Sequence, residues 1–224
     1  RLMDENRGSD AGKRTEVILI AGRSGTGKSS LLRQAKSESK GVFVVGKFDQ
    51  LQSMQPYSAS ITAFDKVVHS ILAEDADDVA SIKEGILNAV GTNGKVLTDV
   101  IPSLVKVIGE QPEVAHVTGI EAQNRFRYTA QCFTRAICTP QRPLICVLDD
   151  LQWCDSASID LMRTLVTDES NKYLLFIGCY RVDEMDADHH VSLQFEKMKN
   201  EDVPFTTIEL GGIGLDSMTS FVSE

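Results

Sequence analysis

The chain has 224 residues, of which 42% are hydrophobic, so it is long enough to bury one large core without disulfide bonds. Its 23 basic and 32 acidic residues give a formal net charge of −9, which disfavours nucleic acid and anionic lipid as partners for the surface as a whole. No apolar stretch reaches the about 18 residues that a membrane helix needs, and the N-terminus is too charged for a signal peptide, so we expect a cytoplasmic protein without a membrane segment.

The first segment, residues 1–15, is polar and aperiodic, and it predicts a flexible arm before an ordered core over residues 16–224. Five apolar, β-rich runs follow in that core, at residues 17–21, 41–46, 143–148, 173–179 and 205–210. Because these runs are continuously apolar rather than alternating, they predict strands covered on both faces, as in a parallel sheet between helices. The five cysteines lack CxxC spacing, which indicates reduced core residues.

Helical patterns separate the strands, at residues 28–38, 60–73, 78–90, 119–138 and 156–166, and Asp216 is positioned to cap another helix. This alternation predicts an α/β fold with three layers, an α/β/α sandwich. The insert between the second and third strands, residues 56–140, is unusually long, and its prolines and glycines predict a division into short helices. The acidic run 183–190 is expected to be a solvated loop. Because the chain stops within a helical pattern, we expect a fragment of a longer protein.

The segment between the first strand and the first helix carries the strongest motif. It reads Gly22-Arg23-Ser24-Gly25-Thr26-Gly27-Lys28-Ser29-Ser30 and fits the phosphate-binding pattern GxxxxGK[ST] in its strand, loop, helix setting. Glycines let successive N–H groups approach one anion at the start of a helix. We therefore expect these nine residues to bind a nucleotide, with Lys28 acting on its terminal phosphates as a catalytic residue and Ser29 ligating Mg²⁺.

A second motif follows the third predicted strand, which ends in Asp149 and Asp150. Mg²⁺ prefers hard oxygen ligands at a strand end beside the phosphates, and we expect Asp149 to be such a metal ligand. Asp150 is the expected catalytic residue that polarises the attacking water, while a turn with a helix cap is the alternative. Arg181, after the fourth strand, is a third expected catalytic residue that contacts the γ-phosphate, while a solvated loop arginine is the alternative.

The spacing of the two motifs indicates the class of phosphate-loop protein. A whole strand lies between the loop strand and the acidic strand along the chain, which predicts the spatial order 5-1-4-3-2 for a P-loop NTPase sandwich. The guanine-reading motif NKxD and the transporter motif LSGGQ are both missing. We therefore expect ATP or ADP, with Mg²⁺, as the bound cofactors.

Several further stretches add a family resemblance. They read GRSGTGKSSLL, GKFDQLQ, EAQNRF, LDDLQWCDSAS and CYRVDE. With the two motifs, they resemble the AAA-type ATPase module of STAND signalling proteins, especially that of multi-sensor histidine kinases and related serine/threonine kinases. The resemblance covers residues 14–222. It implies an ATP-dependent switch whose output lies in other domains, with Lys28 and Ser29 at phosphate and Mg²⁺, an acidic pair at 149–150 and a sensing arginine at 181.

The resemblance also implies a helical lid and a winged helix after the fifth strand, where this chain ends. Lys47 and Arg125 lie in the similar stretches without an assigned role. Lys47 is positioned to face the nucleotide or a neighbouring subunit. Arg125 is either a finger that reaches a second subunit or a structural partner of Glu121, one helical turn away.

Three functions compete on the sequence. The leading expectation is a signalling switch that binds ATP and hydrolyses it slowly, in contact with other domains of the same protein and in a possible homo-oligomer. A scaffold that holds the nucleotide without hydrolysis is one alternative. A nucleic-acid-loading AAA+ ATPase is the other, and the net charge of −9 disfavours it.

Overall fold

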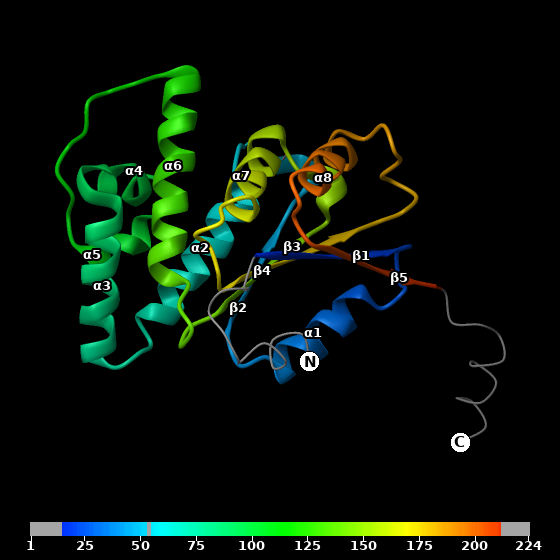
Figure 1. Ribbon diagram of the computed structural model, residues 1–224, viewed down its shortest axis with the longest axis horizontal. Helices are drawn as coiled ribbons and strands as arrows, with labels where there is room; N and C mark the ends of the chain where they lie inside the picture. The colour runs from blue at the N-terminus through cyan, green and yellow to red at the C-terminus, as the bar shows by residue number, and fades with distance from the viewer. Residues whose placement is uncertain (1–14, 53–54, 212–224) are drawn as a thin grey trace.

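Five apolar strands pair in parallel in the computed structural model, which describes residues 15–52 and 55–211. They are β1 (Glu16–Gly22), β2 (Val42–Lys47), β3 (Leu144–Asp149), β4 (Leu174–Tyr180) and β5 (Phe205–Leu210). Their order across the sheet is β2-β3-β4-β1-β5, which confirms the predicted order 5-1-4-3-2. Since all pairs are parallel, the carboxyl ends of the strands meet at one edge of the sheet, and β5 ends on the right of Figure 1.

Helices cover both faces of this sheet, which confirms the three-layer arrangement. They are α1 (Lys28–Glu38), α2 (Ser58–Ile71), α3 (Ala76–Val90), α4 (Gly94–Thr98), α5 (Val105–Ile108), α6 (Gly119–Ile137), α7 (Ser156–Val166) and α8 (His190–Asn200). Figure 1 shows α1 on one face and α2, α7 and α8 on the other. The layers are unequal, because α1 covers its face with a small apolar cluster around Leu32, whereas the opposite face carries most of the core.

The helix α8 corrects the expectation for the segment after the fourth strand. The loop that follows β4 ends at His189, and α8 then buries Val191, Phe195 and Met198. These three residues have the spacing of one helix face, and charged and polar residues surround them in the sequence. Thr15, the last residue of the expected arm 1–15, is instead buried, and its hydroxyl donates to the carbonyl oxygen of Asn171 at 2.7 Å. Residues 1–14 of that arm and the cap expected at Asp216 lie outside the described residues.

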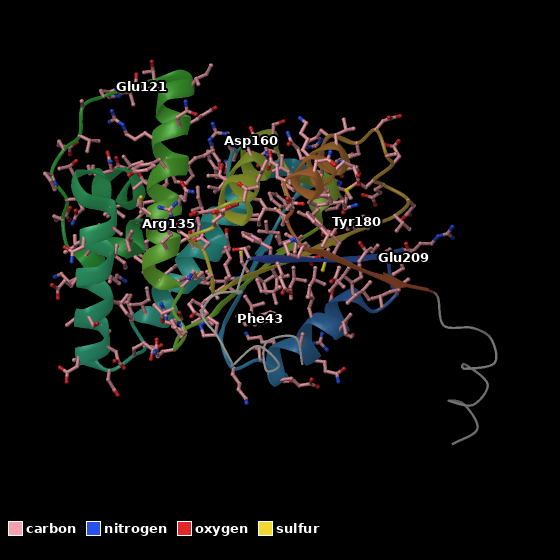
Figure 2. All side chains as sticks on the ribbon, viewed as in Figure 1. Phe43, Glu121, Arg135, Asp160, Tyr180 and Glu209 are labelled. Atoms are coloured by element: carbon pink, nitrogen blue, oxygen red, sulfur yellow. The ribbon has the colours of Figure 1, made fainter. Side chains whose placement is uncertain are left out.

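The long insert forms a separate group of helices, α3 to α6, at the opposite end of the molecule from α1 (Figure 1). As predicted, glycines and prolines divide it: Gly91 and Gly109 follow α3 and α5 with φ values of 54° and 79°, and Pro102 begins a short 3-10 turn. Arg135 of α6, which Figure 2 labels, donates two hydrogen bonds, of 2.6 and 2.8 Å, to the buried carboxylate of Asp168 after α7. This bidentate pair fixes the insert to the core.

None of the helices within residues 15–52 and 55–211 combines the length and the apolar character of a membrane span.

Candidate functional site

The phosphate loop joins the end of β1 to the first turn of α1. Gly25 and Gly27 adopt left-handed backbone conformations, with φ values of 81° and 94°, which residues with a side chain avoid. At Gly22 an added Cβ atom would lie 2.6 Å from Thr26 Oγ1 and 2.9 Å from the carbonyl oxygen of Leu210. Glycine at these three positions therefore allows the backbone to turn sharply from the strand into the helix.

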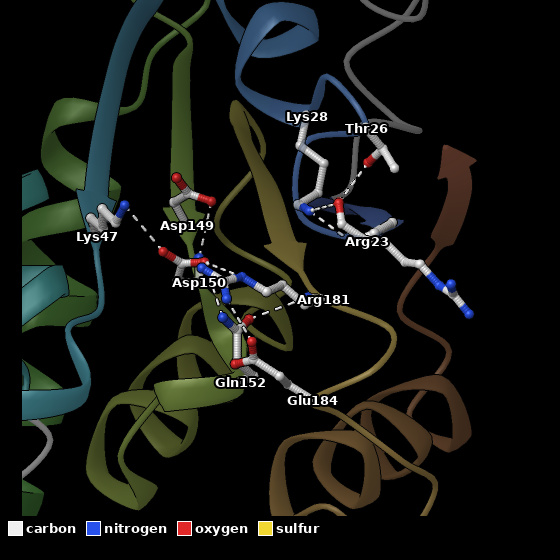
Figure 3. A network of polar contacts seen from close by, with 10 residues as sticks. Arg23, Thr26, Lys28, Lys47, Asp149, Asp150, Gln152, Arg181 and Glu184 are labelled. Atoms are coloured by element: carbon white, nitrogen blue, oxygen red, sulfur yellow. Dashed lines mark hydrogen bonds and ion pairs between the residues drawn. The ribbon is translucent and has the colours of Figure 1, made fainter. Parts of the chain in front are cut away.

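Lys28 lies across this loop (Figure 3). Its Nζ atom donates hydrogen bonds to the carbonyl oxygens of Gly22, at 2.7 Å, and Arg23, at 2.9 Å. The hydroxyl of Thr26 donates to the same Arg23 oxygen at 2.9 Å. These bonds fix the ammonium group over the loop, where its charge can attract an anion.

The open face of the loop fits a phosphate chain. No heavy atom lies within 4 Å of the positions that Cβ atoms would take at Gly25 and Gly27, and Ser29 and Ser30 are exposed. The first turn of α1 contains no acidic residue, and no side chain caps it. The positive end of the helix dipole thus faces an uncrowded space, which is the environment that phosphate groups require.

The same region fits a divalent cation that phosphate oxygens help to coordinate. Ser29 and Asp149 present hard oxygen atoms of the type that Mg²⁺ prefers. In the part of the chain that the structure describes, no group of three or more His, Cys, Asp or Glu residues could hold a metal ion. A cation bound here would therefore take most of its ligands from phosphate and water, as Mg²⁺ commonly does.

The acidic pair and the phosphate loop meet at the carboxyl edge of the sheet, on either side of β4. Burial and the neighbouring charge of Asp150 raise the pKa of Asp149, and the charge of Lys28 acts in the opposite direction. Cys179 of β4 is close to both motifs: burial, and then the charge of Asp149, raise the pKa of its thiol to about 12, while the charge of Lys28 acts in the opposite direction. Residues 22–30 and 149–150, far apart in sequence, thus lie close together at one edge of the sheet.

Asp150 lies in a network of polar contacts (Figure 3). Its residue is only 6% exposed, and its backbone is left-handed, with φ 57°. The carboxylate oxygen Oδ2 is 3.1 Å from Lys47 Nζ. The other oxygen, Oδ1, accepts a hydrogen bond from Gln152 Nε2 at 3.0 Å and is 3.7 Å from Arg181 Nε. The residue expected to polarise water is therefore held from both of its carboxylate oxygens.

Lys47 is the last residue of β2 and lies opposite Asp149 in the pairing of β2 with β3. Its hydrogen bond to Asp150, followed by the charge of Asp150, raises the pKa of Lys47. The Lys47 side chain is 65% exposed, so solvent screens this ion pair and its contribution is at most about 1 kcal/mol. Of the two positions expected for Lys47, the geometry supports the one beside the nucleotide site.

Arg181 follows β4 directly and contacts three side chains. Its guanidinium group donates to Glu184 Oε1 at 2.6 Å, lies 3.7 Å from Asp150 and stacks 5.1 Å from the centre of the Trp153 ring. The contact with Glu184 matches the loop-arginine alternative, whereas the contact with Asp150 places Arg181 beside the acidic pair. Its role as a sensing arginine remains a prediction.

Arg125 lies away from this site. It contacts Glu121 of the same helix at 3.9 Å and donates to the carbonyl oxygen of Ala115 at 2.7 Å. Figure 2 shows Glu121 at the end of α6 that projects beyond the sheet. These contacts support the structural alternative for Arg125.

Gln152 lies in the stretch LDDLQW, and no pattern in the sequence assigned it a role. The structure places its side chain, which is buried, between Asp150 and Arg181. One pattern in the sequence could have indicated this position. Gln152 carries an amide two residues after an expected catalytic carboxylate, and the apolar residues Leu151 and Trp153 flank it. A polar side chain buried among apolar neighbours needs hydrogen-bond partners, and the nearest are those of the site.

Comparisons with known proteins agree with these motifs. A family profile described as "AAA ATPase domain" matches residues 6–177. Hybrid signal transduction histidine kinase G of Dictyostelium discoideum is 39% identical over 167 residues, which cover 74% of this chain and 5% of that protein. The chain thus spans a small part of the length of this curated relative. Among solved structures, the structure of Drosophila ORC bound to GC-rich DNA and Cdc6 aligns with 94% of this chain and 58% of that chain, at 12% identity and a TM-score of 0.41.

Proposed function

The chain belongs to the AAA ATPase domain family, and on this premise we propose that it is an ATP-binding, slowly hydrolysing switch module of a signal-transduction protein. The observation that carries the proposal is the meeting of the phosphate loop, residues 22–30, with Asp149 and Asp150 at one edge of the sheet. The identity with part of a hybrid histidine kinase supports the signalling context. We assign residues 16–224 to one ATPase core.

In this proposal the loop binds the phosphates of ATP or ADP. The N–H groups of residues 22–30 and the ammonium group of Lys28 hold the phosphate oxygens. Ser29 and Asp149 provide oxygen ligands for Mg²⁺, which neutralises phosphate charge when bound. The raised pKa of Asp149 reflects burial and the Asp150 charge, and a nearby cation would favour its ionised form.

Hydrolysis would depend on Asp150 and Arg181. Asp150 would orient a water molecule and accept its proton, and Arg181 would stabilise the negative charge that develops on the transferred phosphoryl group. Both residues are engaged with each other and with neighbours. We therefore expect slow turnover, because these contacts must rearrange before either residue can act on the γ-phosphate.

The same contacts favour a second candidate function, a scaffold that holds the nucleotide without chemistry. A carboxylate bound by Lys47 and Gln152 has few lone pairs left for a water molecule. Such a scaffold would retain ADP or ATP tightly and release no phosphate over hours. Measured phosphate release distinguishes it from the switch.

The proposed partners are other domains of the same protein, such as sensor or kinase modules, and further copies of the chain. Nucleic acid is not favoured, because the net charge of −9 opposes binding to phosphate backbones. A cytoplasmic location is likewise proposed from the sequence alone.

Two substitutions test the proposal. We expect Lys28→Ala to abolish ATP binding, because it removes the cation over the loop, and isothermal titration with ATP and Mg²⁺ measures this loss.

We expect Asp150→Asn to retain binding and to lower phosphate release by about 10²-fold or more, because the amide cannot accept the proton. Lys36→Ala, in the last turn of α1, is the matched control and should behave like the unaltered chain.

Different results contradict different parts of this proposal. If the unaltered chain gives no heat and no thermal shift with ATP and Mg²⁺, nucleotide binding is wrong. If Asp150→Asn releases phosphate at the normal rate, the role of Asp150 is wrong and the binding role stands.

A further inference from the structure

Gln152 is a polar residue in a short 3-10 turn, Leu151–Trp153, that follows Asp150. Its residue is 6% exposed, so its amide group has little access to water. The two ends of the amide bond to different elements. Nε2 donates to Asp150 Oδ1 at 3.0 Å, and Oε1 accepts a hydrogen bond from the backbone N–H of Arg181 at 3.3 Å. Gln152 therefore connects the end of β3 with the end of β4.

The Gln152 amide can make both hydrogen bonds in only one of its two orientations. Exchanging the oxygen and the nitrogen of the amide would set Oε1 against the Asp150 carboxylate and Nε2 against the Arg181 N–H. Both contacts would then be repulsive. The direction of the amide is thus dictated by its two partners, one after each of the two strands.

The fold brings Gln152 to this position through Gly178. The pairing of β3 with β4 ends at Leu148 and Gly178, and beyond it the two chains separate. A Cβ atom at Gly178 would lie 2.4 Å from Leu151 Cδ1, so the missing side chain allows the turn to fold over β4. Gln152 then spans the gap between the two strand ends.

Burial distinguishes this contact from the ion pairs around Asp150. The Lys47 side chain is 65% exposed, and the Arg181 side chain is 29% exposed, with its Nε atom 3.7 Å away from the carboxylate. Solvent weakens ion pairs of this kind. A buried hydrogen bond to a charged carboxylate is stronger and more directional. Of the three groups around Asp150, Gln152 makes the contact that solvent weakens least.

We propose that Gln152 is a positioning residue that couples the β4 end at Arg181 to the orientation of the Asp150 carboxylate. Contact of Arg181 with the terminal phosphate shifts its backbone, and Gln152 transmits that shift to Asp150. The inference rests on the proposed function, because it assumes a nucleotide in the phosphate loop. It adds a coupling that is specific to the state of the terminal phosphate.

Trp153 is the single tryptophan of the chain, and its fluorescence reports this coupling without requiring ATP hydrolysis. It follows Gln152 directly, and the guanidinium group of Arg181 lies over its ring at 5.1 Å. A change in the position of Arg181 alters the surroundings of the indole. We therefore expect the fluorescence of Trp153 to differ between the chain saturated with ATP and Mg²⁺ and the chain saturated with ADP and Mg²⁺.

Two variants distinguish the contributions of the two hydrogen bonds that the Gln152 amide makes. Gln152→Met keeps a similar shape and removes both hydrogen bonds. Gln152→Glu retains an acceptor for the Arg181 N–H and places a carboxylate against Asp150. The matched control is Gln34→Glu on α1, where the exposed Gln34 amide also donates to a carboxylate, Glu38 Oε1, at 3.1 Å. Thermal unfolding verifies that each variant is folded.

The measurements are ATP affinity by calorimetry, phosphate release and Trp153 fluorescence. We expect both Gln152 variants to bind ATP within about threefold of the unaltered chain and to lower kcat about tenfold, the usual effect of losing one hydrogen bond to a charged group. In the Asp150→Asn background, Gln152→Met should lower kcat no further, because it acts through Asp150. A purely structural role would lower kcat by the same factor in both backgrounds.

The inference fails while the proposed function stands if ATP binds and the Gln152 variants turn over like Gln34→Glu. It also fails if Gln152→Met has an equal effect in both backgrounds. If the unaltered chain binds ATP but releases no phosphate, fluorescence decides: a difference between ATP and ADP that Gln152→Met abolishes supports the coupling, and no difference in the unaltered chain overturns it. If ATP does not bind, the proposed function itself is wrong.

Discussion

Gly46 determines how closely β2 approaches α2. A Cβ atom at Gly46 would lie 2.1 Å from the carbonyl oxygen of Ala59 and 2.8 Å from its carbonyl carbon. These are backbone atoms of a helix, so they cannot move aside as the end of a flexible side chain can. Because Lys47 follows Gly46, this close approach also fixes the point from which Lys47 reaches Asp150.

We expect Gly46→Ala to lower the free energy of unfolding by about 1–3 kcal/mol, because the added methyl group forces β2 and α2 apart. Gly85→Ala is the control: no heavy atom surrounds its Cβ position on the exposed face of α3, and alanine should raise the free energy of unfolding by about 0.5–1 kcal/mol. Urea titration measures both. Equal stability of the two variants would show that the contact between β2 and α2 relaxes without cost.

At the scale of elements, α8 depends on two histidines at its start. His189 Nδ1 accepts a hydrogen bond from the Val191 N–H and so caps the helix, and His190 Nε2 donates to the carbonyl oxygen of Cys154. Burial, and then the neighbouring His190, lower the pKa of His189 below 6.5, while the Gln152 backbone and Asp186 act in the opposite direction. Protonation would convert the capping acceptor into a donor.

Acid is therefore expected to destabilise α8. Since the pKa of His189 is lower in the folded chain than the 6.5 of a free histidine, the unfolded chain binds more protons below that pH, and stability falls as the pH decreases. We expect a loss of about 0.5–1 kcal/mol, the usual contribution of one helix cap, as the pH falls below the 6.5 of a free histidine. His189→Asn retains a capping acceptor that does not titrate, so thermal unfolding of this variant should depend less on pH. The exposed His116→Asn should match the unaltered chain.

At the scale of the whole molecule, the core contains ionisable thiols. All five cysteines of the chain lie in its described part, and all are buried and unpaired with one another. Burial raises the pKa of Cys138, Cys146 and Cys179 to about 12, from an ordinary value of 9.0. These three thiols stay protonated near neutral pH, which makes them unreactive until the chain unfolds. The burial of all five cysteines agrees with the predicted core positions.

These thiols predict instability in alkali. Their pKa is raised in the folded chain, so their full contribution is present below pH 9.0 and is lost as the pH rises towards about 12. Each thiol should reduce the free energy of unfolding by up to about 1.4 kcal/mol per pH unit in that window. Cys146→Val removes one titrating group from the sheet. The urea midpoint of Cys146→Val should decline less steeply with pH than that of the unaltered chain. Identical slopes would contradict the raised pKa of the Cys146 thiol.

Much of the fold was predictable because local patterns determine it. Continuous apolar runs such as residues 144–148 have to be buried on both faces, and this requirement predicted the parallel sheet. The strand order was predicted from the spacing of the two motifs, because a whole strand lies between the loop strand and the acidic strand along the chain. The phosphate loop was predictable for a similar reason: glycines at positions that need left-handed backbone, followed at once by a helix, work through contacts within nine residues. The helix α8 was not predicted, because it buries only a few residues between charged and polar ones and its apolar periodicity is weak.

The sequence by itself determined the strands, the phosphate loop and the acidic pair as separate features, because each depends on neighbours along the chain. Only the tertiary structure decided what holds Asp150: Lys47, Gln152 and Arg181 come from the end of β2, the turn after β3 and the end of β4. Their meeting depends on strand order, on the close approach at Gly46 and on the turn that Gly178 admits. Contacts between elements distant in sequence leave no periodic signal, so the arrangement that controls Asp150 had to be seen in three dimensions.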